Sequence, residues 1–279
     1  QEKPSVKFDP APEQKKNILT KFLTASEEED VTHIAFINKK TPETSSWTYA
    51  HELGRLYLKD AFHDRVRTKA YDNISDTEDA VAAIEQAIAD GNEMIFTTSP
   101  EFLSASLRVA VNHPEIKILN CSLNASHKYI RTYYGRMYEA KFLIGVLAGV
   151  MTDTNKIGYI ADYPIFGMTA NINAFALGVK MVNPKAKIYL EWSTLKENEH
   201  IDLTAKLYSL GATYISHQDM IIPRKISRQF GLFRVNGETP VNLAFPAWNW
   251  GKYYERIIRN VQNGIWNTEE KSDAKKALH

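Results

Sequence analysis

The chain has 279 residues, of which 44% are hydrophobic and 24% are charged, as in an ordinary globular protein. Its formal net charge of +1 excludes a strong electrostatic attraction to nucleic acid or to an anionic membrane surface. A single cysteine, Cys121, excludes an internal disulfide and a thiolate metal cluster. The sequence holds no apolar run long enough to span a bilayer.

The first 30 residues are expected to form a linker that contains a short helix. Residues 1–13 are polar and include three prolines, a composition typical of linkers. Apolar residues recur at helical spacing over 17–24 and predict a short amphipathic helix. The start lacks the apolar core and cleavage site of a signal peptide, so the sequence leaves the compartment of the protein open.

Beyond this start, strands and helices alternate along the chain. Short apolar runs predict strands at residues 33–37, 66–71, 94–97, 116–120, 130–134, 156–161, 186–192, 212–217 and 232–235. Helical periodicity and capping residues predict helices at 47–62, 76–90, 99–112, 138–151, 168–182, 199–210, 226–230 and 250–263. This alternation predicts an α/β protein in which crossover helices connect parallel strands.

The alternation restarts after the apolar helix at 138–151, so the chain holds two βα series. The last helix indicates that the chain crosses back to complete the first series. We therefore expect two lobes, with residues 31–151 and 240–279 in the first and residues 152–239 in the second. Lobes joined by several crossings form a hinge, and a ligand would lie between them.

Aromatic residues gather at strand-to-helix corners, where open α/β sheets bind their ligands. Trp47, Trp248 and Trp250 are three of only five tryptophans, and all three fall at such corners. Flat side chains in these positions suit a flat or ring-shaped ligand, although a tryptophan also serves as an ordinary core residue. We expect Trp47 and Trp248 to contact the ligand, and Trp250, which opens the last helix, to belong to the core.

Polar side chains also follow several of the predicted strands. Thr98 and Ser99 precede a helix whose free backbone N–H groups favour an acceptor atom on a ligand, although Ser99 also fits as the helix cap. Gln218 is a donor and an acceptor at once, which suits the edge of a heterocycle. Two further candidates stand at or beyond a strand end, Tyr163 and Trp192.

Asp219 follows an apolar strand, where an acidic side chain is not expected to be buried without a partner. Its carboxylate either accepts hydrogen bonds from a ligand amine or pairs with Arg224 or Arg228. Both interpretations stay open at this point.

The sequence offers no constellation for catalysis or for a bound cofactor. The glycine motifs of dinucleotide and triphosphate sites are absent, and no paired acid and base stands out. Cys121 has no positioned base in the sequence, and the eight histidines lack metal-ligand spacing. We therefore expect a binding protein with no enzyme activity, no cofactor and no metal.

Seven strings of the sequence occur in the order found in one known family. They are SSWTYAHELGR, NEMIFTTSPEF, TYYGRMYEAKFLIGVLAG, KIGYIADYPI, NINAFALGVKMVNP, SHQD and FPAWNWGKYYE. Together they resemble the basic membrane protein family of substrate-binding proteins, of the purine- and nucleoside-binding type, over residues 31–266. The resemblance implies a two-lobed type I periplasmic-binding-protein fold, each lobe a parallel sheet flanked by helices. It further implies capture of a purine base such as adenine, or of a nucleoside, for an ABC importer whose permease would be the partner.

The resemblance carries ligand-binding roles to residues of both lobes and of the crossing: Trp47, Thr98, Ser99, Gln218, Asp219, Trp248 and Asn249. Among them, Trp47 is implied to stack on the ligand. The chain departs from the family in the loop that begins with Asn38, a further candidate, because this loop lacks the usual Asp-Gly-Gly. The segment before Trp248 is shorter than in the family and lacks an aspartate-rich turn.

Several alternatives remain beside a purine importer, one of them an interaction module whose cleft holds no ligand. The family default is a protein held at the outer side of the cell membrane, but some similar proteins carry this domain behind an unrelated N-terminal domain. The chain would then be a cytoplasmic domain that senses a small molecule within a larger protein. An aromatic cleft also favours a sugar, so the ligand class stays open between purine and sugar.

Overall fold

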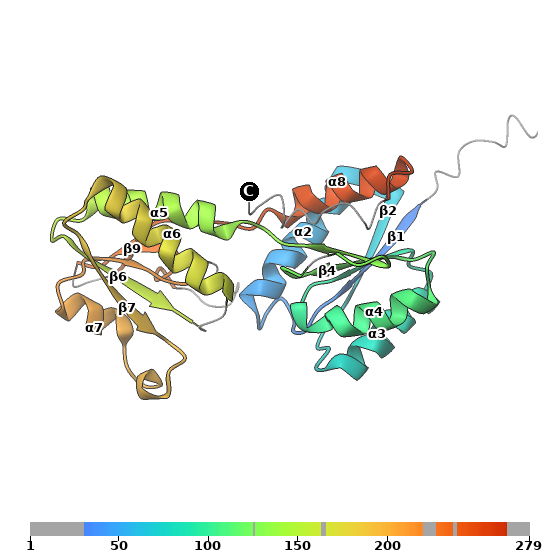
Figure 1. The fold of residues 1–279 in the computed structure, drawn as a ribbon, viewed down its shortest axis with the longest axis horizontal. Coiled ribbons are helices and arrows are strands. Elements are labelled where there is room, and N and C mark those ends of the chain that lie inside the picture. Colours follow the sequence, from blue (N-terminus) through green and yellow to red (C-terminus); the bar gives the residue numbers. More distant parts are fainter. Residues whose placement is uncertain (1–30, 125, 163–165, 220–226, 237–238, 267–279) are drawn as a thin grey trace, which may run out of the picture.

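In the computed structural model, the chain forms two lobes, each built on a five-stranded sheet flanked by helices (Figure 1). The structure describes residues 31–266 except 125, 163–165, 220–226 and 237–238. The linker and short helix expected within residues 1–30 lie outside this part. Within it, none of the helices has both the length and the apolar character that crossing a bilayer requires.

The first lobe contains a fully parallel sheet of order β2-β1-β3-β4-β5. The sequence predicts the parallel strands but not their order. Its strands are β1 (Thr32–Ile37), β2 (Val66–Tyr71), β3 (Met94–Thr97), β4 (Lys117–Cys121) and β5 (Ile130–Tyr133). Its helices are α2 (Ser46–Phe62), α3 (Thr77–Ala89), α4 (Leu103–Asn112) and α8 (Trp250–Gln262), with 3-10 turns η1 (His63–Arg65) and η2 (Pro100–Phe102).

Alternate residues of the inner strand β1 are buried against opposite layers of helices. Ile34 and Phe36 belong to the core formed with α2 and α8, whereas Ala35 and Ile37 belong to the core formed with α3 and α4. Figure 1 shows these two helix pairs on opposite sides of the sheet. Because successive side chains of a strand point to opposite faces and both faces are covered, β1 is apolar along most of its length.

The second lobe is a mixed sheet of order β10-β9-β8-β6-β7. Its strands are β6 (Lys156–Ala161), β7 (Lys187–Trp192), β8 (Tyr214–Ser216), β9 (Leu232–Arg234) and β10 (Val241–Ala244). Its helices are α5 (Met137–Met151), α6 (Phe166–Val182) and α7 (Leu203–Ser209), with the 3-10 turn η3 (Lys196–Asn198). Helices α5 and α6 cover one face of the sheet and α7 covers the other.

Helices α5 and α6 pack at very close range because glycines lie at their contact. A Cβ atom added at Gly145 would lie 2.1 Å from the carbonyl oxygen of Phe175. A Cβ atom added at Gly178 would lie 2.1 Å from the carbonyl oxygen of Phe142. The two backbones therefore touch directly, and α6 covers the apolar surface of α5.

The second sheet differs from the parallel arrangement expected from the sequence. Strand β9 runs antiparallel to β8, and β10 runs antiparallel to β9. The chain returns at Gly231, whose N–H donates to the Gln218 carbonyl oxygen at 2.6 Å. The helix expected at 226–230 is wrong in its described part, because residues 227–230 are not helical. An antiparallel neighbouring strand needs no crossover helix.

The boundary between the lobes also differs from the expected one. Helix α5 packs on α6, and β10 extends the second sheet beside β9, whereas the expected division placed residues 138–151 and 241–244 in the first lobe. The physical reason is that α5 has an apolar surface to cover and β9 has an open edge to pair. Among the described residues, segments 134–136 and 245–249 therefore lead from one lobe to the other.

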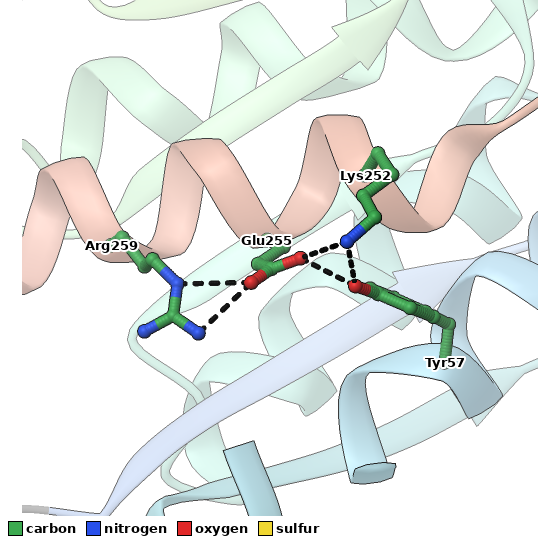
Figure 2. A network of polar contacts seen from close by, with 4 residues as sticks. All are labelled: Tyr57, Lys252, Glu255 and Arg259. Atoms are coloured by element: carbon green, nitrogen blue, oxygen red, sulfur yellow. Dashed lines mark hydrogen bonds and ion pairs between the residues drawn. The ribbon is translucent and has the colours of Figure 1, made fainter. Parts of the chain in front are cut away.

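Helix α8 returns to the first lobe and is joined to α2 by a network of polar contacts (Figure 2). Glu255 accepts hydrogen bonds from the Tyr57 hydroxyl at 2.6 Å, from Arg259 at 2.9 Å and from Lys252 at 3.2 Å. These bonds, that from Tyr57 first, lower the pKa of Glu255 to about 2. The carboxylate is thus stabilised in its charged form.

Replacing Glu255 with glutamine is expected to lower stability at neutral pH and to have no effect in strong acid. The ordinary pKa of this group is 4.5, so its contribution is complete above that pH and is lost as the pH falls toward about 2. Since the network lies at the surface, salt should weaken the effect. The difference in stability between the wild type and Glu255→Gln is measured from urea unfolding midpoints between about pH 7 and pH 2. A difference that stays constant with pH would contradict the prediction.

Candidate functional site

A cleft of about 140 Å³ lies between the lobes and is lined by residues of both. The first lobe and the crossing before α8 contribute Ser46, Trp47 and Trp248. The second lobe contributes Lys141, Tyr159, Ile160, Asp162, Met168, His217, Gln218 and Asp219. Several of these stand at or just beyond the carboxyl ends of β6 and β8, the edge at which open α/β sheets bind ligands.

Trp47 forms the first-lobe wall from the first turn of α2. Ser45 begins this helix as its N-cap, with its hydroxyl accepting a hydrogen bond from the Thr48 N–H at 3.2 Å. The indole Nε1 of Trp47 donates to the carbonyl oxygen of Thr98 at 2.8 Å. This bond fixes the orientation of the ring, which is half-buried at the cleft.

Trp248 is the outermost of three nearly parallel aromatic rings. It stacks on Trp250 with centroids 4.8 Å apart, and Trp250 stacks on His51 at 4.7 Å. Burial lowers the pKa of His51 to about 3, so its ring is uncharged and packs as an aromatic group. Gly135 leaves the space that Trp248 fills, because a Cβ atom there would lie 2.5 Å from the indole.

Trp47 meets Trp248 edge to face, with an angle of 83° between the rings and 5.4 Å between their centroids. The two tryptophans therefore give the cleft a rigid aromatic wall, backed by the core of the first lobe.

The second-lobe wall is polar and is centred on an ion pair. The Lys141 ammonium, which is 2% exposed, donates to Oδ1 of Asp219, which is 19% exposed. Burial raises the pKa of Asp219, while Lys141 opposes this shift and the nearby Asp162 carboxylate adds to it. The partner of Asp219 is therefore Lys141, and not Arg228, one of the partners considered from the sequence; the other, Arg224, lies outside the described residues.

Two further titratable side chains lie beside this pair. Asp162 accepts a hydrogen bond from the Ser193 hydroxyl at 2.7 Å. Burial lowers the pKa of His217, and Asp162 partly offsets this shift, so that the imidazole is neutral near pH 7. The cleft therefore presents carboxylate acceptors, and its buried cation is already paired.

The structure separates the residues predicted from the sequence into distinct groups. Four of them line the cleft: Trp47, Gln218, Asp219 and Trp248. Three are buried behind Trp47 and bonded to one another or to the backbone: Asn38, Thr98 and Ser99. Two lie elsewhere among the described residues: Trp192, packed against the apolar core of the second lobe, and Asn249, exposed at the start of α8. Tyr163 lies outside the described residues.

The group behind Trp47 supports the wall instead of lining it. Thr98 donates its hydroxyl to Oδ1 of Asn38 at 2.7 Å, and Asn38 donates to Asp72 at 2.8 Å. Ser99 caps the following turn, and its carbonyl oxygen accepts a hydrogen bond from Asn120 at 2.9 Å. These bonds hold in place the Thr98 carbonyl that anchors Trp47.

Sequence reasoning missed Lys141, Asp162 and His217. Asp162 and His217 directly follow β6 and β8, so the strand-end rule that pointed to Tyr163 and Gln218 also applies to them. Lys141 carried a different signal, because it is the only charged residue in the apolar stretch from 140 to 151. A lysine on such a helix requires a partner.

Two sheets flanked by helices, with a cleft at their strand ends, define a two-lobed binding protein of the type I periplasmic-binding-protein class. The chain belongs to the family of PnrA-like ABC transporter substrate-binding proteins, whose family model matches residues 31–222.

Individual relatives agree with this membership. A purine-binding protein of Brucella abortus is 27% identical over 256 residues, which cover 88% of this chain and 73% of that protein. A protein of Haloferax volcanii with the provisional name of an ABC transporter glucose-binding protein is 24% identical, over 80% of this chain and 59% of its own length. A solved solute-binding protein of an ABC transporter system from Conexibacter woesei shares the fold, with a TM-score of 0.68 at 15% identity, covering 85% of this chain and 83% of that one.

Proposed function

We propose that the protein captures a purine base or a nucleoside in the cleft between its lobes, as the substrate-binding component of an ABC importer. The observation that carries the proposal is the pairing of an aromatic wall, Trp47 and Trp248, with an acceptor wall, Asp162 and Asp219, across one cleft. A purine has a flat face for the first and N–H donors on its edge for the second. The relationship to a purine-binding protein supports the same ligand class.

The two walls are expected to make different contributions, the aromatic wall to affinity and the acceptor wall to selectivity. A base stacked on an aromatic side chain gains roughly 1–3 kcal/mol, whichever base it is. Discrimination then comes from the edge, because a ligand that lacks a donor leaves the acceptors unpaired and desolvated. Gln218 adds a side chain that both donates and accepts.

Binding without catalysis is part of the proposal. Cys121, the only thiol, is fully buried in the core of the first lobe, and burial raises its pKa far from that of a reactive thiolate. His217 is neutral but lies beside carboxylates and a lysine. Among the described residues that line the cleft, Ser46 at the start of α2 is the only serine or cysteine. A nucleoside should therefore be recovered intact after incubation with the protein, as chromatography would reveal.

Thermal unfolding with a panel of adenine, other purine bases, nucleosides and simple sugars tests the proposal. A ligand at about a hundred times its dissociation constant stabilises the folded protein by roughly 2.7 kcal/mol, which gives a clear rise in the melting temperature. We expect a rise with at least one purine or nucleoside. A rise with glucose alone would replace the purine by a sugar, and no rise with any ligand of the panel would contradict the proposal.

A further inference from the structure

Lys141 is a charged residue buried in the second lobe. It is 2% exposed on a helix that is otherwise apolar from residue 140 to its end. Burying a lysine costs free energy that a partner must offset, and an apolar residue of similar volume is often at least as stable. The lysine therefore does something for the cleft that packing alone does not require.

The ammonium group of Lys141 has several partners within the protein. It donates to Oδ1 of Asp219 and lies 3.5 Å from the carbonyl oxygen of His217. It also lies 5.4 Å from the centre of the Tyr159 ring, in the range of a cation–π contact. A lysine has three donors and no acceptor, and two of them are directed at protein oxygens, so the ammonium is engaged mainly within the protein.

Asp219, in contrast, keeps capacity to accept. A carboxylate offers about four lone-pair positions, and the Lys141 bond uses one of its two oxygens. The side chain is 19% exposed and lines the cleft. A ligand in the cleft would thus meet this carboxylate, whose charge is already paired with the ammonium.

We propose that Lys141 is a positioning residue, which holds Asp219 as an ionised acceptor so that the cleft selects ligands that present an N–H donor. This inference rests on the proposed function, since the donor belongs to a purine or nucleoside. Phosphorylated ligands are disfavoured by the same arrangement, because the paired ammonium offers no free charge to a phosphate.

Charged and titratable groups face Asp219 from each neighbouring element: Lys141 from α5, Tyr159 and Asp162 from the end of β6, and His217 from its own segment. Lys141 lowers the pKa of Asp219, whereas burial and Asp162 raise it. Without Lys141, Asp219 would take up a proton at a higher pH and lose its acceptor character. Removing Lys141 also lets the pKa of His217 rise, so the two groups must be followed separately.

Lys141→Met tests the proposal, with Lys206→Met as the matched control. Lys206 forms a 2.8 Å ion pair with Glu191 in the same lobe, away from the cleft. In the ligand-free proteins, the carbon-13 shift of the Asp219 carboxyl group measures its titration directly. We expect its midpoint to rise by roughly one to three pH units in Lys141→Met and to stay unchanged in Lys206→Met.

Affinity for the purine that stabilises the wild type provides the second readout. In Lys141→Met it should fall as the pH decreases through the raised midpoint, while wild type and Lys206→Met remain constant over that range. Lys141→Arg, which retains the charge, should restore the wild-type profile. The double variant Lys141→Met/Asp219→Asn has no ion to bury and should fold, yet bind weakly at every pH.

Two results would overturn the inference. One is an unchanged Asp219 midpoint in Lys141→Met, which needs no ligand to observe. The other is a double variant that binds as tightly as the wild type. If the wild type binds no purine, the proposed function fails, and the role of Lys141 in ligand selection fails with it. If the wild type binds a purine and the Lys141 variants bind it with unchanged affinity and pH dependence, only the role of Lys141 is refuted.

Discussion

Replacing Trp47 with alanine is expected to weaken ligand binding by tenfold to a hundredfold. The ring forms the first-lobe wall of the cleft, and the loss of one stacked base costs roughly 1–3 kcal/mol, where 1.4 kcal/mol is a factor of ten. The Thr98 carbonyl oxygen also loses the 2.8 Å hydrogen bond from Nε1, so the support behind the wall loosens. Titration calorimetry with the preferred purine measures the change.

A matched control is Trp266→Ala, which removes a tryptophan from the same lobe but outside the cleft. It should lower stability without changing affinity. Trp47→Phe separates the two contributions of Trp47, since it keeps an aromatic face and removes the hydrogen bond to Thr98. Equal affinities of the wild type and Trp47→Ala would place the ligand elsewhere.

Gly145→Ala should destabilise the second lobe by about 3 kcal/mol, the upper end of the range for overpacked cores. The added Cβ would lie 2.1 Å from the Phe175 carbonyl oxygen, a backbone atom that cannot move without α6. Alanine favours the helix by about 1 kcal/mol relative to glycine, which is too little to offset that clash. Urea unfolding of purified protein gives the difference in unfolding free energy.

Gly149→Ala on the same helix serves as the control. Its Cβ would lie 2.7 Å from Cγ2 of Val182, a side chain that is partly exposed and can turn away. It would also lie 3.1 Å from backbone atoms of Val179, a milder contact than the 2.1 Å at Gly145. We expect Gly149→Ala to cost much less than Gly145→Ala. Equal effects would contradict the assignment of Gly145 as the point where the two backbones touch. Lys141 lies one turn before Gly145 on the same helix. Displacement of this helix in Gly145→Ala should therefore also reduce the affinity for the ligand.

Much of the fold could be predicted from local signals. The apolar alternation that buries Ile34 and Phe36 on one face and Ala35 and Ile37 on the other is visible in the sequence, as is the Ser99-Pro100 helix start. The antiparallel return at Gly231 and the packing of α5 on α6 were not predictable in this way. Both depend on which element becomes the neighbour, and that choice is made by contacts between distant segments.

The site likewise combines features that are visible in local sequence with features that depend on distant contacts. The aromatic corner at Trp47 and the polar strand end at Gln218 and Asp219 carry recognisable chemistry in a short stretch of sequence. The sequence did not reveal the partner of Asp219, because Lys141 precedes it by 78 residues and lies on a different element. Asn38 and Thr98 have suitable side chains, but their hydrogen bonds are used within the first lobe. Composition alone does not distinguish a polar residue facing a ligand from one that supports the wall.

Titration calorimetry of the wild type with adenine and adenosine, beside glucose, tests directly whether the cleft binds a purine. We expect saturable binding of one purine or nucleoside per chain, weakened at least tenfold in Trp47→Ala and unaffected in Trp266→Ala. No heat with either purine compound, together with saturable binding of glucose, would contradict it and assign the cleft to a sugar.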